Sequence, residues 1–120
     1  MNTSAVIQVV DDDEAVRAAL SFALKALGFE VSSYSDASDF LGRGQFEQGI
    51  LICDMRMPDI NGIELANLLR GRGSIMPIIL TSGNVRNALK SEALSAGVDT
   101  ILEKPVDLAT ILAEIERIAV

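Results

Sequence analysis

Residues 5–14 read AVIQVVDDDE, an apolar run that ends in four consecutive acidic residues. Similar short apolar runs, each bounded by turn-forming or charged residues, recur at residues 30–34, 50–53, 78–81 and 100–102. Three of the five runs are nearly continuous in Val, Ile and Leu, which is typical of strands that are covered on both faces, as in a parallel sheet. The sequence therefore predicts five short strands of a parallel sheet.

Segments with a helical period alternate with these strands. Over residues 15–27, apolar side chains recur at three- and four-residue spacing, and Gly28 is a natural stop. The same pattern predicts four further helices, over residues 36–41, 63–69, 88–96 and from Asp107 onward. The order is βα repeated five times, and right-handed crossovers place helices on both sides of one sheet. The predicted fold class is α/β, a doubly wound five-stranded parallel sheet.

Size, charge and residue usage narrow the possible functions. With 120 residues, 49% of them apolar, the chain fits one domain, residues 1–120. A net charge of −7 disfavours direct nucleic-acid binding, and no apolar run reaches the roughly 20 residues of a membrane span. Histidine is absent, which excludes histidine-based zinc sites and Ser/His or Cys/His dyads. A single cysteine, Cys53, and the lack of a signal-peptide pattern indicate a cytoplasmic location.

Acidic residues follow the first and third predicted strands. Asp11 and Asp12 end the first, and Asp54 ends the third; taken alone, each also fits a helix cap or a loop. The two strands are commonly neighbours in such sheets, and ligands bind at the carboxyl ends of the strands. Carboxylates about 5 Å apart, at an effective dielectric of about 20, repel by roughly 3 kcal/mol per pair. A divalent cation would relieve this repulsion, and an all-oxygen ligand set favours Mg²⁺ or Mn²⁺.

A hydroxyl and an ammonium group follow the last two strands. Thr81 ends the fourth strand and Lys104 follows the fifth, although each alone is more often a turn former or a solvated charge. Facing a metal-bound carboxylate, they suit a transferred phosphoryl group, because the cations neutralise its oxygens and the hydroxyl donates one hydrogen bond. In this interpretation Asp54 is the nucleophile and becomes an aspartyl phosphate.

These residues resemble the motifs of one family, the receiver domains of two-component response regulators, over nearly the whole chain. The matching stretches are VVDDDE at 9–14, DMRMPD at 54–59 with NG at 61–62, LT at 80–81 and EKP at 103–105. The resemblance implies a flavodoxin-like receiver fold with strand order 2-1-3-4-5. It also implies a phosphoacceptor signalling domain rather than an enzyme, with at most self-phosphorylation from small donors and self-dephosphorylation.

The resemblance assigns roles to the acidic residues. Asp54 would accept a phosphoryl group from the phosphohistidine of a sensor histidine kinase or a phosphotransfer protein. Asp11 and Asp12, with Asp54 and the backbone carbonyl of Arg56, would hold Mg²⁺, with Mn²⁺ as an alternative.

The resemblance also implies an output. Lys104 would bind a phosphoryl oxygen through its ammonium group, and the Lys104–Pro105 peptide bond would be cis. Thr81 would move toward the phosphoryl group. The face formed by the fourth helix, fifth strand and fifth helix would then change and bind an output domain, an effector protein or a second copy in a phosphorylation-dependent homodimer. The Asp-x-Arg-Met-Pro pattern is similar to receivers that precede DNA-binding domains, which favours a piece of a longer transcription regulator over a stand-alone receiver.

One position departs from the family pattern. Three residues before the lysine, receivers commonly carry Tyr or Phe, whose ring turns inward when the threonine moves, whereas this chain has Ile101. Isoleucine has no polar tip, so signal transmission is expected to depend on the loop over residues 81–88 and the fourth helix.

Three other interpretations are compatible with the sequence. The first is a receiver-like interaction module that is never phosphorylated. The second is a haloacid-dehalogenase-like phosphatase with Asp11 as nucleophile, although the expected Thr is missing from DDDEA at 11–15. The third is a flavodoxin-like electron carrier, but the four acids after the first strand would repel a flavin phosphate.

Overall fold

A computed structural model describes residues 5–119 of the chain. Its sheet has five parallel strands in the order β2-β1-β3-β4-β5, so the predicted fold class and strand order are confirmed. The strands are β1 (Val6–Val10), β2 (Glu30–Tyr34), β3 (Ile50–Asp54), β4 (Ile78–Ser82) and β5 (Thr100–Glu103). Strand order reverses between β1 and β3, which places a ligand site at the carboxyl ends of these two strands.

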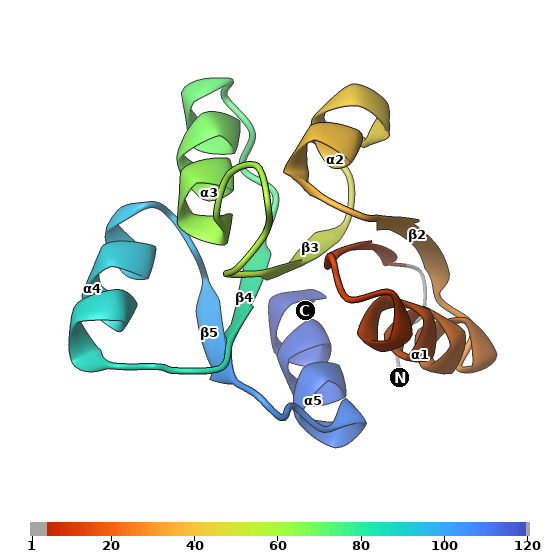
Figure 1. The fold of residues 1–120 in the computed structure, drawn as a ribbon. Coiled ribbons are helices and arrows are strands. Elements are labelled where there is room, and N and C mark those ends of the chain that lie inside the picture. The colour runs from red at the N-terminus through yellow and green to blue at the C-terminus, as the bar shows by residue number, and fades with distance from the viewer. Residues whose placement is uncertain (1–4, 120) are drawn as a thin grey trace.

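Five helices cover the two faces of the sheet. Figure 1 shows α1 and α5 side by side on one face, with α2, α3 and α4 on the other. The helices are α1 (Glu14–Ala26), α2 (Ala37–Arg43), α3 (Gly62–Gly71), α4 (Asn87–Ser95) and α5 (Leu108–Ala119). No helix within residues 5–119 has the length and apolar character that crossing a membrane requires.

Two hydrophobic clusters fill the space on either side of the sheet. The larger cluster packs under α2, α3 and α4 and includes Phe40, Leu65 and Leu80, each 0% exposed. The smaller one lies under α1 and α5 and includes Ile7, Leu24 and Ile115, also 0% exposed. All five residues of β3 and of β4 are buried, which explains why their sequences lack a polar alternation.

The helix boundaries follow local capping rules. α1 begins one residue earlier than predicted, because the Asp13 carboxylate accepts a hydrogen bond from the Val16 N–H and caps the helix. α3 begins with a capping box in which Asn61 and Glu64 accept hydrogen bonds from each other's backbone N–H groups. This cap anchors the loop that follows the predicted phosphoacceptor at the end of β3.

The apolar side of α1 is less completely buried than its apolar period predicts. Leu24 is fully buried, but Val16 and Leu27 are 41% and 40% exposed. Periodicity identifies the apolar side of a helix, whereas the neighbouring helix decides how much of that side is covered. Part of this apolar side therefore remains open to solvent beside the functional site.

Candidate functional site

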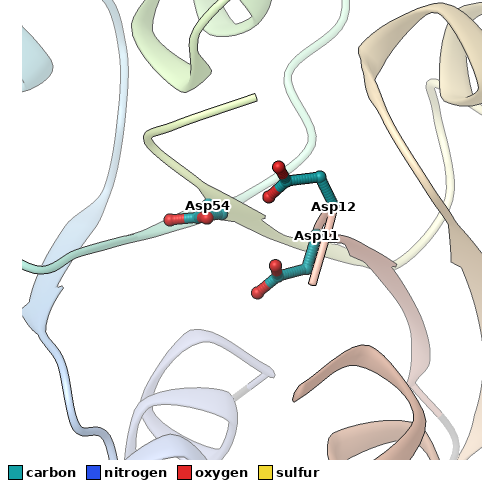
Figure 2. A group of neighbouring side chains, drawn as sticks. All are labelled: Asp11, Asp12 and Asp54. Atoms are coloured by element: carbon teal, nitrogen blue, oxygen red, sulfur yellow. The ribbon is translucent and has the colours of Figure 1, made fainter. Parts of the chain in front are cut away.

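The strand register brings the predicted site residues to one edge of the sheet. Val10 pairs with Cys53, so Asp11 and Asp54 each lie one residue farther along neighbouring strands. Figure 2 shows the side chains of Asp11, Asp12 and Asp54 grouped at this edge. Each offers a carboxylate oxygen, and these oxygens all lie within 4.8 Å of one another. The predicted convergence of the three acids is confirmed.

The carboxylates are crowded and largely withdrawn from water. Asp11 is 5% exposed and Asp54 is 7% exposed, whereas Asp12 is exposed. Burial raises the pKa of Asp11, the Asp13 N–H and Lys104 oppose this, and the charges of Asp54 and Asp12 add to the rise. The site therefore carries more negative charge than its own side chains neutralise, which favours a bound cation.

Lys104 faces the two buried carboxylates. Its Nζ atom lies 3.2 Å from Asp54 Oδ1 and 3.6 Å from Asp11 Oδ2. Partial burial of the ammonium acts against its charge, but the attraction of Asp11 and Asp54 outweighs it and raises the pKa of Lys104. The Lys104 backbone N–H donates to the Ser82 carbonyl at 2.8 Å, and the predicted cis Lys104–Pro105 peptide is confirmed. The lysine thus extends from β5 across the strand ends.

Thr81 lies at the same edge on β4. It pairs with Asp54 in the strand register, and its carbonyl accepts a hydrogen bond from the Met55 N–H at 2.7 Å. Thr81 is 6% exposed and lines the same crevice as Asp11, Asp54 and Lys104. The four predicted side chains therefore share one concave site.

The loop after β3 carries Arg56, whose backbone carbonyl is the predicted fourth metal ligand. Two contacts hold this loop: the Gly62 N–H donates to the Met55 carbonyl at 2.9 Å, and the Ser38 N–H donates to Asp59 Oδ2 at 2.6 Å. The Arg56 side chain is exposed, consistent with a position that contributes only through its backbone. The role of this carbonyl stays a prediction.

Two predictions concern residues next to the site. Cys53 is fully buried, and burial raises the pKa of its thiol, so it acts as a packing residue rather than a redox centre. Ile101 packs against the larger hydrophobic cluster from a partly buried position. It occupies the position where receiver domains commonly carry Tyr or Phe, and its side chain has no polar group to expose.

Two residues that support the site were not predicted. Arg17 donates from Nη1 to the Asp11 carbonyl at 2.7 Å, which anchors the loop that bears Asp11 and Asp12. Glu103 accepts a hydrogen bond from the Val85 N–H at 3.1 Å and so ties β5 to the loop after β4. The sequence did contain a signal for Arg17. A cation near a helix N-terminus interacts unfavourably with the helix dipole, so its presence there indicates that the side chain makes a compensating contact.

The donor set fits a hard divalent cation. Among the described residues, the cluster offers carboxylate oxygens only, and the nearby Cys53 sulfur is buried and directed at the Asp54 carbonyl. Oxygen ligands with room for water suit Mg²⁺ or Mn²⁺ and do not suit zinc, which prefers nitrogen and sulfur. The acidic site can therefore bind a metal ion.

Residues 7–116 match the family model described as the response regulator receiver domain. The chain belongs to this family. Membership supports the resemblance drawn from the motifs and decides against the phosphatase and electron-carrier alternatives. The receiver is therefore a signalling domain of two-component systems.

Relatives of this receiver include transcription regulators. The chain is 39% identical to the transcriptional regulatory protein FixJ of Azorhizobium caulinodans over 96% of its length, and 32% identical to the tetrathionate response regulatory protein TtrR of Salmonella typhimurium over 94%. It spans about half the length of these relatives, 55% in each case.

Solved structures share the fold of this receiver. The response regulator StyR superimposes with a TM-score of 0.87 at 36% identity, covering 96% of this chain and 59% of StyR. A two-component response regulator from Clostridium difficile gives a TM-score of 0.89 at 20% identity, covering 97% and 96% of the two chains. The second likeness concerns the fold alone.

Proposed function

We propose that this receiver accepts a phosphoryl group on Asp54 from the phosphohistidine of a sensor histidine kinase or phosphotransfer protein, in a reaction that requires Mg²⁺. The observation that carries this proposal is the position of Lys104, whose ammonium lies 3.2 Å from Asp54 in a site with two further carboxylates. An attacking carboxylate needs its charge offset before it can approach an anionic phosphoryl group. Asp11, Asp12, Asp54 and the Arg56 carbonyl would hold Mg²⁺, which neutralises phosphoryl oxygens.

The chain's own residues divide the remaining work. One Asp54 oxygen forms a bond to phosphorus while the phosphorus–nitrogen bond of the donor breaks, and the electron pair of that bond leaves with the imidazole. Lys104 binds a phosphoryl oxygen, and Thr81, on the neighbouring strand, donates a hydrogen bond to another. The single domain over residues 1–120 would thus act as a phosphoacceptor signalling domain rather than an enzyme, with at most self-phosphorylation from small donors and self-dephosphorylation.

Phosphorylation would change the face formed by α4, β5 and α5. The phosphoryl group adds acceptor oxygens that recruit Thr81 and Lys104, which biases an existing two-state equilibrium. The loop between β4 and α4, tied to Glu103 through Val85, would move with Thr81. That face would then bind an output domain, an effector or a second copy, and the output would be transcription regulation by a longer parent protein.

Acetyl phosphate and Mg²⁺ provide the direct test, with intact mass as the readout. The wild-type chain is expected to gain one phosphoryl group, and Asp54→Asn is expected to gain none. Omitting Mg²⁺ should abolish labelling as well. Labelling that persists in Asp54→Asn would place the acceptor elsewhere, and no labelling of a folded wild-type chain would favour an interaction module that is never phosphorylated.

A further inference from the structure

The turn after β1 holds its three acidic side chains by unequal means. The Asp11 carboxylate accepts a hydrogen bond from the Asp13 N–H at 2.9 Å, and the Asp13 carboxylate accepts one from the Val16 N–H at 3.2 Å. The Asp12 side chain is exposed, and within residues 5–119 its carboxylate accepts no hydrogen bond. In this part of the chain the position of the Asp12 carboxylate therefore depends on the Asp12 backbone.

Arg17 fixes the backbone on which Asp12 depends. Its Nη1 atom donates a hydrogen bond to the Asp11 carbonyl at 2.7 Å. This carbonyl belongs to the peptide unit that joins Asp11 to Asp12, and a peptide unit is planar from one Cα atom to the next. Fixing the direction of the carbonyl therefore fixes the plane that contains the Asp12 N–H and Cα.

Two backbone hydrogen bonds support this contact from either side. The Asp11 N–H donates to the Tyr34 carbonyl at 3.2 Å, which ties Asp11 to β2. The Arg17 N–H donates to the Asp13 carbonyl at 2.9 Å, which ties the arginine backbone to the same turn. Arg17 is partly buried, and a hydrogen bond from a charged donor is stronger than one between neutral groups. The arginine therefore forms a short link between the start of α1 and the turn that carries Asp12.

The charge and the position of Arg17 have opposite effects on a bound cation. A positive charge near a divalent ion weakens its binding by repulsion. A group that fixes the position of a ligand instead favours the ion whose coordination tolerates the least displacement. Mg²⁺ requires near-ideal octahedral geometry at short distances, whereas the larger Ca²⁺ accepts irregular arrangements of more oxygens.

We propose that Arg17 is a positioning residue that holds Asp12 for an ion of the size of Mg²⁺ and so makes the site prefer Mg²⁺ to Ca²⁺. The inference rests on the metal site of the proposed function. Figure 2 shows the carboxylates of Asp11 and Asp12 extending from the end of β1 on the side of Asp54. Rotation of the peptide unit between Asp11 and Asp12 would displace one ligand relative to the other two, which impairs binding of the smaller ion more.

The ratio of Mg²⁺ affinity to Ca²⁺ affinity provides the test, with both affinities measured by calorimetry on the metal-free chain. In Arg17→Met this ratio is expected to fall at least about threefold. Loss of a group that orients a metal ligand typically costs about tenfold or more in affinity, and Ca²⁺ tolerates part of the displacement. The loss of one positive charge acts equally on two divalent ions, so it cancels in the ratio.

Two other variants separate position from charge. Arg17→Lys keeps the charge, but its side chain is shorter and ends in a single ammonium, so its ratio should lie between those of the wild type and Arg17→Met. Lys25→Met is the matched control, because it removes a positive charge from an exposed position of the same helix. Its ratio should equal that of the wild type. Urea unfolding of the metal-free variants shows whether each is folded before titration.

A second measurement uses no metal ion. In NMR spectra of the metal-free chain, the amide signals of Asp12 and Asp13 should shift in Arg17→Met and stay in place in Lys25→Met, because only Arg17→Met releases the peptide unit.

An unchanged affinity ratio in folded Arg17→Met would overturn the inference. Equally tighter binding of both ions is what a purely electrostatic role gives, and equally weaker binding is what general loosening of the fold gives. If Arg17→Met does not fold, a wild-type ratio in Arg17→Lys would overturn the inference in its place. Absence of Mg²⁺ binding by the folded wild-type chain would overturn the proposed function as well.

Discussion

Replacing Lys104 with methionine tests the charge balance of the site. The Lys104 ammonium lies 3.2 Å from an Asp54 oxygen and 3.6 Å from an Asp11 oxygen, and the side chains of these acids are 9% and 7% exposed. At an effective dielectric of about 20, each attraction is about 5 kcal/mol before desolvation is subtracted. Lys104→Met keeps most of the side-chain volume but leaves the carboxylates to repel one another without compensation.

The expected cost to the metal-free chain is about 3 kcal/mol in free energy of unfolding, the lower end of the range for removing one partner of a buried ion pair. The lower end applies because the lysine side chain is 30% exposed. Urea unfolding at neutral pH measures this cost. The exposed Lys90→Met, on α4, is the matched control and should change stability by less than about 0.5 kcal/mol.

Magnesium should reduce the loss of stability that Lys104→Met causes. Without a competing ammonium, Lys104→Met should bind Mg²⁺ about tenfold more tightly, equal to about 1.4 kcal/mol, while losing the ability to be phosphorylated. Calorimetry measures the Mg²⁺ affinity. The difference in free energy of unfolding between Lys104→Met and wild type should be smaller in MgCl₂ than in KCl of equal ionic strength. Unchanged Mg²⁺ affinity together with a stability loss under about 1 kcal/mol would refute the view that the lysine offsets the acidic cluster.

Three further predictions concern residues around the site. Burial raises the pKa of Asp11 in the folded chain above its usual 3.8, so the unfolded chain loses this proton first and stability falls as the pH rises above 3.8. Asp11→Asn should therefore stabilise the metal-free chain at pH 7 and lose this advantage at a pH below 3.8. The same substitution should weaken Mg²⁺ binding at least about tenfold in calorimetry. A Cβ on Gly62 would lie 2.9 Å from the Asp54 carbonyl oxygen and close to Leu80, so Gly62→Ala should lower the free energy of unfolding in urea by about 1–3 kcal/mol. Gly71→Ala is the control, because a Cβ at this position of the same helix would have nothing within 4 Å, and it should not destabilise the chain. Arg70 donates to the carbonyls of Ser74, Met76 and Gly97, and Arg70→Met should cost about 2–3 kcal/mol by the same measurement; an unchanged midpoint would show that water replaces these bonds.

Much of the fold was predictable because its signals are local. Continuous apolar runs identified β3 and β4 as buried strands, and both are buried throughout. The helices were found from their period, with ends that differ by a residue or two, as for α1 at Glu14, because capping depends on the geometry of the turn before the helix. The acids were placed together by one topological rule about where strand order reverses.

The supporting contacts required the tertiary structure. Arg17 reaches back to the Asp11 carbonyl, and Gln8, in the middle of an apolar strand, is buried and donates to the carbonyls of Gln45 and Gln48. In the sequence, Gln8 stands out only as a polar residue in an apolar run. That observation does not identify its hydrogen-bond partners, which lie about forty residues away. Such contacts depend on the path of loops, which residue types describe poorly.

The sequence by itself determined the order of strands and helices and the chemical identity of the site, because periodicity and the residues at strand ends are properties of the chain alone. Only the tertiary structure decided the distances on which the chemistry depends, such as the approach of Lys104 to Asp54 across fifty residues of sequence. It also decided that Ala19 and Ala23 leave a crevice beside the site. The physical reason is that charge balance and cavity shape arise from groups that packing, rather than sequence neighbourhood, brings together.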